Sequence, residues 1–194
     1  MLALFLLYAL LVSSSHSQKR CCVDKQFSAI LADPSDIARG SYQFSHIAED
    51  FEAKLLATTT FQFSPGNSSI PLSRVVQDFN QGIQYVIYSD KCTSQKLQYT
   101  MQGPCVPDDA EFLGSNIIGY QPKTLNINGY RWKFANQEAY IAMTFSDDCT
   151  PLVESIIGTI NGGPVDRTYI FNQYQKTITD RSIFNIPATC TTST

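Results

Sequence analysis

Six cysteines are the residues of this sequence with the clearest chemistry. They are Cys21, Cys22, Cys92, Cys105, Cys149 and Cys190. An even number of cysteines in an exported chain is typical of disulfide bonds, so we expect all six to be paired. A zinc site is the alternative, but no C-x-x-C pair occurs and only His46 follows the first 17 residues. Spacing alone does not choose among the many pairings that six cysteines allow.

Two pairs of adjacent aspartates are the candidate metal ligands: Asp108 with Asp109, and Asp147 with Asp148. Calcium takes roughly six to eight oxygen ligands, usually from several carboxylates and carbonyls. No EF-hand loop occurs, and adjacent aspartates are also typical of turns and caps. A weak site in extracellular calcium is physically reasonable, so calcium is the cofactor that these four residues would hold.

Catalytic groups are scarce, and we expect no enzyme. A Ser-His-Asp or Cys-His arrangement would have to use His46, whose place in an alternating stretch indicates the solvent side of a strand. No G-x-S-x-G elbow occurs, and the glycines of residues 158–163 are not followed by the Lys-Ser/Thr of a phosphate-binding loop. No motif marks a carboxylate pair of the glycosidase type, so a secreted hydrolase ranks last.

The amino terminus indicates export. Residues 2–12 form an unbroken apolar run, too short for the roughly 20 residues of a membrane span but suited to a signal peptide. Small residues at Ser15 and Ser17 fit cleavage before Gln18. We therefore expect a signal peptide at residues 1–17, one secreted domain at residues 18–194, and no membrane span. Asn67 begins the single N-x-S/T sequon, a predicted glycosylation site.

The elements that must position these residues are strands. Period-two alternation or β-branched and aromatic composition favours strands at residues 58–63, 83–88, 96–102, 125–127, 139–145, 153–160 and 167–171. Turn signals occur at residues 80–82, 128–129 and 161–164, and short helices are expected only at residues 35–39 and 106–113. Many short strands at this spacing predict an all-β domain, a sandwich or half-open barrel stapled by disulfides.

Composition narrows the function classes further. The chain has 194 residues, 43% hydrophobic, with a formal net charge of −3. That is enough apolar content for a core, and the charge argues against a nucleic-acid partner, whose phosphates need a surplus of Lys and Arg. Aromatic residues make up 12% of the chain. They could fill a core or line an apolar ligand pocket, and the sequence does not separate the two.

An ordered set of motifs resembles the ependymin-related proteins. The motifs are Cys21-Cys22 followed by Gln26-Phe27, residues 82–88 leading to Cys92, residues 104–110 around Cys105, residues 148–151 around Cys149, and residues 182–187 ending at Cys190. They run over residues 21–190, nearly the whole mature chain. The family usually has Trp-Glu-Gly after the first cysteines, where this chain has Phe27-Ser28-Ala29.

The resemblance implies a secreted glycoprotein with two stacked antiparallel sheets, like bacterial lipoprotein carriers, enclosing a deep apolar pocket. It also implies homodimers, lipid-like ligands, calcium binding and cell–matrix adhesion. Carried over by motif, Cys92 pairs with Cys190 and Cys21 with Cys149, which leaves Cys22 and Cys105 for each other.

Our first hypothesis is accordingly a non-enzymatic carrier of a hydrophobic, lipid-like ligand, and calcium-dependent adhesion to the extracellular matrix is the alternative. Apolar residues from both sheets would line the pocket, among them Ile83, Tyr85, Leu97, Tyr99, Trp132, Tyr140 and Phe171.

Overall fold

A computed structural model describes residues 20–41, 43–64, 68–89, 91–134, 137–160 and 162–190. The predicted signal peptide and the predicted glycosylation site Asn67 lie outside these residues. No helix in this part of the chain is long and apolar enough to span a bilayer.

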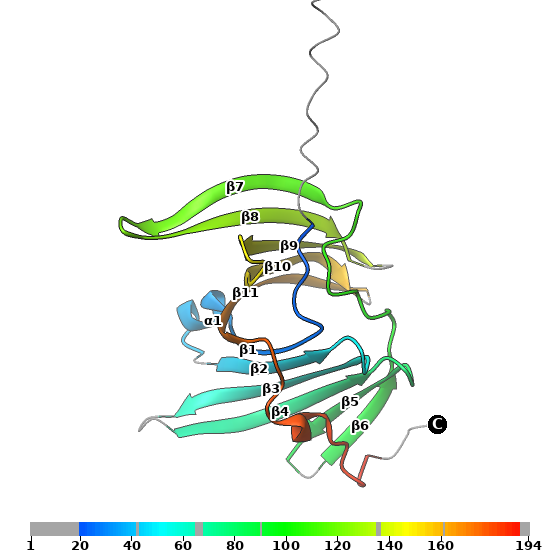
Figure 1. The fold of residues 1–194 in the computed structure, drawn as a ribbon. Helices are drawn as coiled ribbons and strands as arrows, with labels where there is room; N and C mark the ends of the chain where they lie inside the picture. The colour runs from blue at the N-terminus through cyan, green and yellow to red at the C-terminus, as the bar shows by residue number, and fades with distance from the viewer. Residues whose placement is uncertain are drawn as a thin grey trace, which may run out of the picture.

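Within the described residues, eleven strands form one antiparallel sheet in the order β6-β5-β4-β3-β2-β1-β11-β10-β9-β8-β7 (Figure 1). The strands are β1 (Gln26–Ala32), β2 (Gln43–Asp50), β3 (Leu55–Ser64), β4 (Ser68–Asp78), β5 (Ile83–Tyr88), β6 (Lys91–Lys96), β7 (Glu111–Tyr120), β8 (Lys123–Lys133), β9 (Glu138–Ser146), β10 (Pro151–Ile160) and β11 (Gly163–Gln175). The helix α1 (Pro34–Ala38) and the 3-10 helix η2 (Arg181–Phe184) are the helical elements described.

The sheet bends over so that its two halves face each other (Figure 1). Strands β1–β6 form the first layer and β7–β11 form the second, with the β1/β11 pair between them. The all-β prediction is confirmed, but the two layers are halves of one continuous sheet where the resemblance implies two stacked sheets. Strands β6 and β7 are the edges, and the sheet is not closed into a barrel.

One hydrophobic core lies on the outer face of the first layer. Ala48, Ala57, Val76 and Tyr85 are paired in register across β2, β3, β4 and β5, and all are buried. Ile178 and Phe184 of the C-terminal segment cover this row. The Cys92–Cys190 disulfide and an ion pair between Arg181 and Asp50, at 2.7 Å, fasten the segment to the layer.

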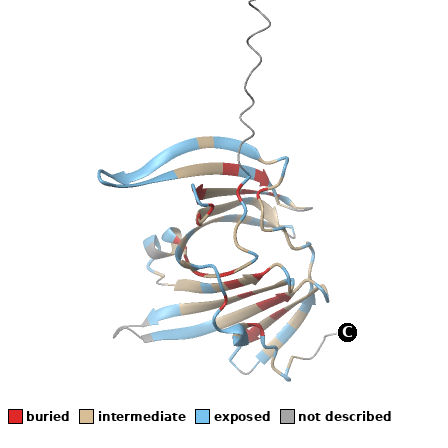
Figure 2. Ribbon diagram, viewed as in Figure 1, coloured by how far each residue is buried: buried red, intermediate tan, exposed pale blue. Residues whose placement is uncertain are grey.

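A second core lies on the second layer, where Tyr130, Trp132, Ile141 and Phe145 of β8 and β9 are buried together. Figure 2 shows that burial on β8 is concentrated near its C-terminal end, whereas β7 is exposed along nearly its whole length. The buried residues of β9 lie near both of its ends. The N-terminal segment completes this core, because Cys21 packs into the cluster.

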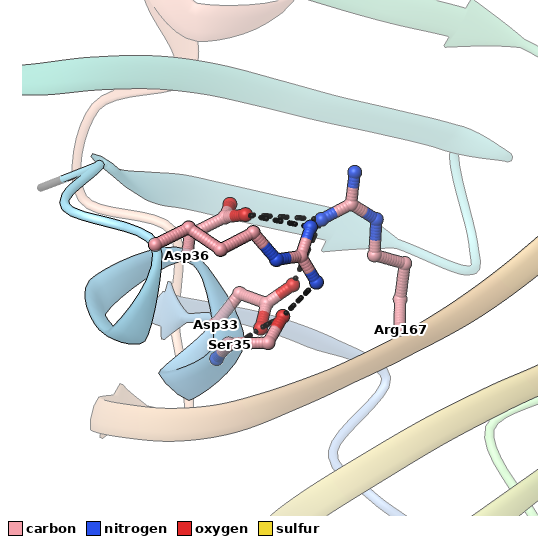
Figure 3. Close-up of polar contacts among 5 residues, drawn as sticks. Asp33, Ser35, Asp36 and Arg167 are labelled. Atoms are coloured by element: carbon pink, nitrogen blue, oxygen red, sulfur yellow. Dashed lines mark hydrogen bonds and ion pairs between the residues drawn. The ribbon is translucent and has the colours of Figure 1, made fainter.

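The helix α1 confirms the prediction at residues 35–39, and polar contacts anchor it (Figure 3). The buried Asp33 carboxylate accepts hydrogen bonds from the Ser35 backbone N–H and hydroxyl, at 2.8 and 2.6 Å, which caps the first turn. Arg167 of β11 donates to Asp33 and Asp36, each at 3.1 Å. Burial by itself would raise the pKa of Asp33, but the contacts from Ser35 and Arg167 hold it below its ordinary value.

Three local predictions were wrong. Residues 106–113 are not helical, because Val106 is buried against Cys21 and β7 begins at Glu111. The turn expected at residues 128–129 lies inside β8. The strand expected at residues 96–102 ends at Lys96, and the chain then leaves the sheet as an irregular connection at residues 97–110, which we call the crossing segment.

Candidate functional site

A cavity of about 240 Å³ lies between the two layers. Alternation in the strands places apolar side chains in it from both sides. Those from the first layer include Phe27, Ile47 and Leu56, and those from the second include Trp132, Ile141 and Met143. On β2, for example, Ile47 faces the cavity while its neighbour Ala48 is buried in the outer core, as the period of two requires.

The crossing segment forms one wall of the cavity, with residues 99–106 lining it. It connects the two edge strands, and in Figure 1 it runs in green along the side of the fold from β6 to β7. Hydrogen bonds hold the segment to both layers. Gln77 of β4 donates to the Tyr99 hydroxyl at 2.6 Å, and the Trp132 indole of β8 donates to Gln102 at 2.9 Å.

The N-terminal segment, residues 20–25, is hydrogen-bonded to the crossing segment. The Val23 N–H donates to the Pro104 carbonyl and the Val106 N–H to the Cys21 carbonyl, each at 2.8 Å. The Cys22–Cys105 disulfide lies between these two hydrogen bonds. The wall is therefore covalently attached to the chain just before β1.

Two glutamates, Glu49 of β2 and Glu154 of β10, line the cavity, and we call them the acidic pair. Burial raises the pKa of Glu49 to about 8, with a further contribution from the negative charge of Glu154. Burial also raises the pKa of Glu154 to about 7. An isolated carboxylate is costly in an apolar environment, so Glu49 keeps its proton at neutral pH, whereas Glu154 is about half protonated there.

Gln77 and Tyr99 add polar groups beside the acidic pair. The charge of Glu49 acts on Tyr99, whose pKa is raised mainly by burial, so that the phenol keeps its proton. Because the Tyr99 hydroxyl accepts from Gln77, its own O–H is left to donate. The cavity thus combines apolar walls with a small group of hydrogen-bonding side chains, which is typical of small-molecule sites.

A wider, more open groove of about 790 Å³ adjoins the cavity. The two share part of the crossing segment, Phe51 and Phe79 as walls. Lys54 and Lys96 line the groove, whereas the cavity lining contains no Lys, Arg or His among the described residues.

Some of the predicted pocket residues line the cavity, some line the adjoining groove, and two lie elsewhere. Tyr99, Trp132 and Phe171 line the cavity, and Leu97 lines the adjoining groove. Ile83 lines the groove but packs mainly against the outer core, in which Tyr85 is buried.

The assignment of Tyr85 and Tyr140 to the pocket was wrong. Tyr85 lies on the outer face of the first layer because its partner in the sheet is Val76, whose neighbour Gln77 faces the cavity. Tyr140 is 53% exposed, with the Arg131 guanidinium 5.7 Å from its ring centroid. The next residue of β9, Ile141, has the opposite direction and lines the cavity.

Sequence reasoning missed the acidic pair. A signal was present, because Glu49 has the same parity as Ile47 in β2, and Glu154 the same parity as Ile156 in β10. A carboxylate on the apolar face of a strand is unusual, and that position could have marked both residues as functional.

The six cysteines form the disulfides Cys21–Cys149, Cys22–Cys105 and Cys92–Cys190, and no described cysteine is free. These are the pairs that the resemblance implies. Each disulfide joins a segment outside the sheet, at one terminus of the domain, to a strand, a turn or the crossing segment.

The four predicted calcium ligands are not assembled into a site. Asp108 forms an ion pair with Arg20 at 3.0 Å, and Asp147 accepts from Asn126 at 2.9 Å. Asp148 accepts from the Ser146 hydroxyl and the Thr150 N–H, in the manner of a turn residue. In the described ranges, no three His, Cys, Asp or Glu side chains come together as a metal ion would need.

Comparison with known proteins decides the family. The sequence matches the Ependymin family over residues 67–190. The chain belongs to the ependymin family. The match spans β4 to the last disulfide, and so includes the crossing segment and the whole second layer. Membership supports a secreted, non-enzymatic protein, with which the three disulfides agree.

No curated protein matches the sequence. Among solved structures, an uncharacterized conserved protein from Thermus thermophilus is similar to this ependymin-family chain. The identity is 10%, the TM-score is 0.48, and the alignment covers 85% of this chain and 87% of the other.

Proposed function

We propose that this protein is a secreted carrier that binds a hydrophobic, lipid-like ligand in the cavity between the two layers. The observation that supports the proposal is the cavity itself, with apolar side chains from both layers and a wall tied down by hydrogen bonds and a disulfide. Family membership agrees with a non-enzymatic role outside the cell.

The volume limits the ligand that the cavity alone can take. At about 30 Å³ per water-sized group, about 240 Å³ accommodates a chain of roughly eight carbons. Burial of eight methylenes at about 0.8 kcal/mol each contributes at most about 6 kcal/mol. About 6 kcal/mol corresponds to a dissociation constant of about 40 μM, and ordering costs weaken binding to the range of about 0.1 to 1 mM. A longer chain would extend into the adjoining groove.

The acidic pair does not favour a hydrolase. Glycoside hydrolysis needs one ionised carboxylate and one protonated acid, with room for water and polar groups that hold a sugar. Here the walls around the two carboxyls are largely apolar, and few polar groups are available to hold a sugar. Hydrolysis of a nitrophenyl glycoside or ester that Glu49→Gln abolishes would overturn the non-enzymatic proposal.

Isothermal titration calorimetry with octan-1-ol tests the carrier proposal. Met143→Trp fills the cavity from β9 and should abolish binding, whereas Tyr140→Trp places the same side chain on the exposed side of the same strand and should leave binding intact. Thermal melting of both variants controls for folding. Absence of octan-1-ol binding to the wild type, or equal loss in both variants, would contradict the proposal.

We also propose a homodimer that buries an apolar patch of the β7–β8 hairpin. Ile118, Tyr120 and Leu125 share one face of the hairpin, and they are 46%, 69% and 40% exposed. Exposed apolar side chains on an edge hairpin are typical of interfaces. Light scattering after size exclusion should show a dimer that Ile118→Glu dissociates, while Ile117→Glu, on the opposite face, does not. A monomeric wild type would refute this.

Calcium-dependent matrix adhesion stays a prediction from the resemblance. If it is correct, millimolar calcium should raise the melting temperature, because a ligand that binds the folded state stabilises it by mass action. An unchanged melting temperature would remove this alternative.

A further inference from the structure

The charges that line the cavity have one sign. Among the described residues, its charged side chains are those of Glu49 and Glu154, and no basic residue compensates them there. The two glutamates come from opposite layers, β2 and β10, and the charge of Glu154 acts on Glu49 across the cavity.

Neither carboxyl of the acidic pair has a hydrogen-bond or ion-pair partner within the described ranges. Both residues are half-buried, so each side chain keeps some accessible surface, and both line the cavity. Buried carboxyls in folded proteins are normally paired or hydrogen-bonded. The cavity therefore contains two unpaired acceptor groups that its own walls do not satisfy.

We propose that the cavity selects amphiphiles with a cationic, ammonium-type headgroup over fatty acids, with the headgroup placed against Glu49 and Glu154. This inference rests on the proposed carrier function. An alkyl chain would contact the apolar walls, and an ammonium group would donate hydrogen bonds to the carboxylates as a charged partner. A fatty-acid carboxylate in the same place would meet like charges and no cationic side chain.

The raised pKa values support this preference. Near neutral pH the pair shares protons because nothing in the cavity stabilises both charges. A bound ammonium group would stabilise the ionised pair, and so the protein would release protons as the ligand binds. The side-chain oxygen of Gln77, which also lines the cavity, is an acceptor that could receive a further hydrogen bond from the headgroup.

The adjoining groove provides the competing explanation. Lys54 and Lys96 line it, and they would attract an anionic headgroup left outside the cavity. If these lysines determine the headgroup, octanoate should bind more tightly than octylammonium.

The test compares three ligands with the same chain, octylammonium, octan-1-ol and octanoate, by isothermal titration calorimetry of the full mature protein at pH 7.5. We expect octylammonium to bind at least tenfold more tightly than octanoate. A tenfold ratio of dissociation constants corresponds to about 1.4 kcal/mol, and the interaction between two charges in a protein interior readily exceeds that energy. Glu49→Gln and Glu154→Gln should each reduce this preference at least fivefold without weakening the binding of octan-1-ol. Glu138→Gln, a surface change on β9, should alter neither.

The outcomes separate the two proposals. If octan-1-ol binds but octanoate equals or exceeds octylammonium, the headgroup inference is wrong and the carrier function stands. If the preference persists in both glutamine variants, the acidic pair is not its source. If none of the three ligands binds, the carrier function itself fails. Proton release on octylammonium binding, measured in two buffers of different ionisation enthalpy, should be smaller in Glu49→Gln than in the wild type.

Discussion

Replacing Glu49 by glutamine should make the protein markedly more stable at alkaline pH and only slightly more stable at acidic pH. The substitution keeps the shape of the side chain and removes its charge. In the folded protein, burial and the charge of Glu154 raise the pKa of Glu49 from 4.5 to about 8. The unfolded chain exposes this carboxyl to water, where it ionises near its ordinary pKa.

The magnitude follows from this difference between folded and unfolded states. Because the folded state holds the proton up to about pH 8, wild-type stability falls as the pH rises from about 4.5 to about 8. Complete ionisation costs about 5 kcal/mol, from a pKa difference of roughly 3.5 at about 1.36 kcal/mol for each pKa unit. At pH 5 the same linkage gives only about 1 kcal/mol. Glu49→Gln should therefore gain about 4 kcal/mol over wild type between pH 5 and pH 9.

Urea unfolding at several pH values between 5 and 9 measures this gain. Trp132 is the single tryptophan of the chain and lines the cavity, so its fluorescence reports on the region around Glu49. The disulfides are kept intact, and Glu138→Gln serves as the matched surface control. Equal unfolding free energies for Glu49→Gln and wild type at every pH would refute the assignment of Glu49 to the protein interior.

Three other substitutions test the framework around the cavity by the same urea unfolding. Arg167→Met should lower the free energy of unfolding by about 1.5 kcal/mol, because the buried Asp33 carboxylate loses its cationic partner. This value is at the low end for hydrogen bonds to charged groups because Arg167 is 42% exposed. An unchanged free energy of unfolding would show that other contacts hold α1. Gly158→Ala should cost about 1–3 kcal/mol, since its φ of +136° is open mainly to glycine and a β-carbon would strike the backbone of β9; an unchanged midpoint would contradict this geometry. The double change Cys92→Ala and Cys190→Ala should cost about 2–5 kcal/mol by freeing a loop with a sequence separation of 98; a smaller loss under non-reducing conditions would show that the C-terminal segment is held by packing alone.

Alternation along the strands was enough to predict most of the sheet. Residues 58–63 lie in β3, residues 139–145 in β9 and residues 153–160 in β10. These stretches are paired on both sides, so the local pattern and the sheet agree. Residues 96–102 alternate as well, but β6 is an edge strand with no further partner among the described strands. The chain there crosses to the other layer, and Tyr99 and Gln102 form contacts that an isolated pattern does not encode.

The direction of each side chain was harder to predict than the strands themselves. In β5 the apolar residues Ile83 and Tyr85 lie on one face. One face of the first layer borders the cavity, and the C-terminal segment packs against the other. The alternation shows which residues share a face of the strand. It does not show which part of the protein packs against that face. That packing depends on residues 177–190, more than 80 residues away in the sequence, and on the way the whole sheet bends.

Because one hydrogen-bonded sheet supplies both walls of the cavity, the distance between the walls follows from the curvature of the backbone. An irregularity in pairing occurs at the bend, at Ser28–Ile30 between β1 and β11. Bulges of this kind increase local twist. A small change of twist at the β1/β11 pair would displace the strands of both layers that lie farther from the bend by a larger distance. A change of twist at this pair would therefore alter the width of the cavity while every strand keeps its hydrogen-bonded neighbours.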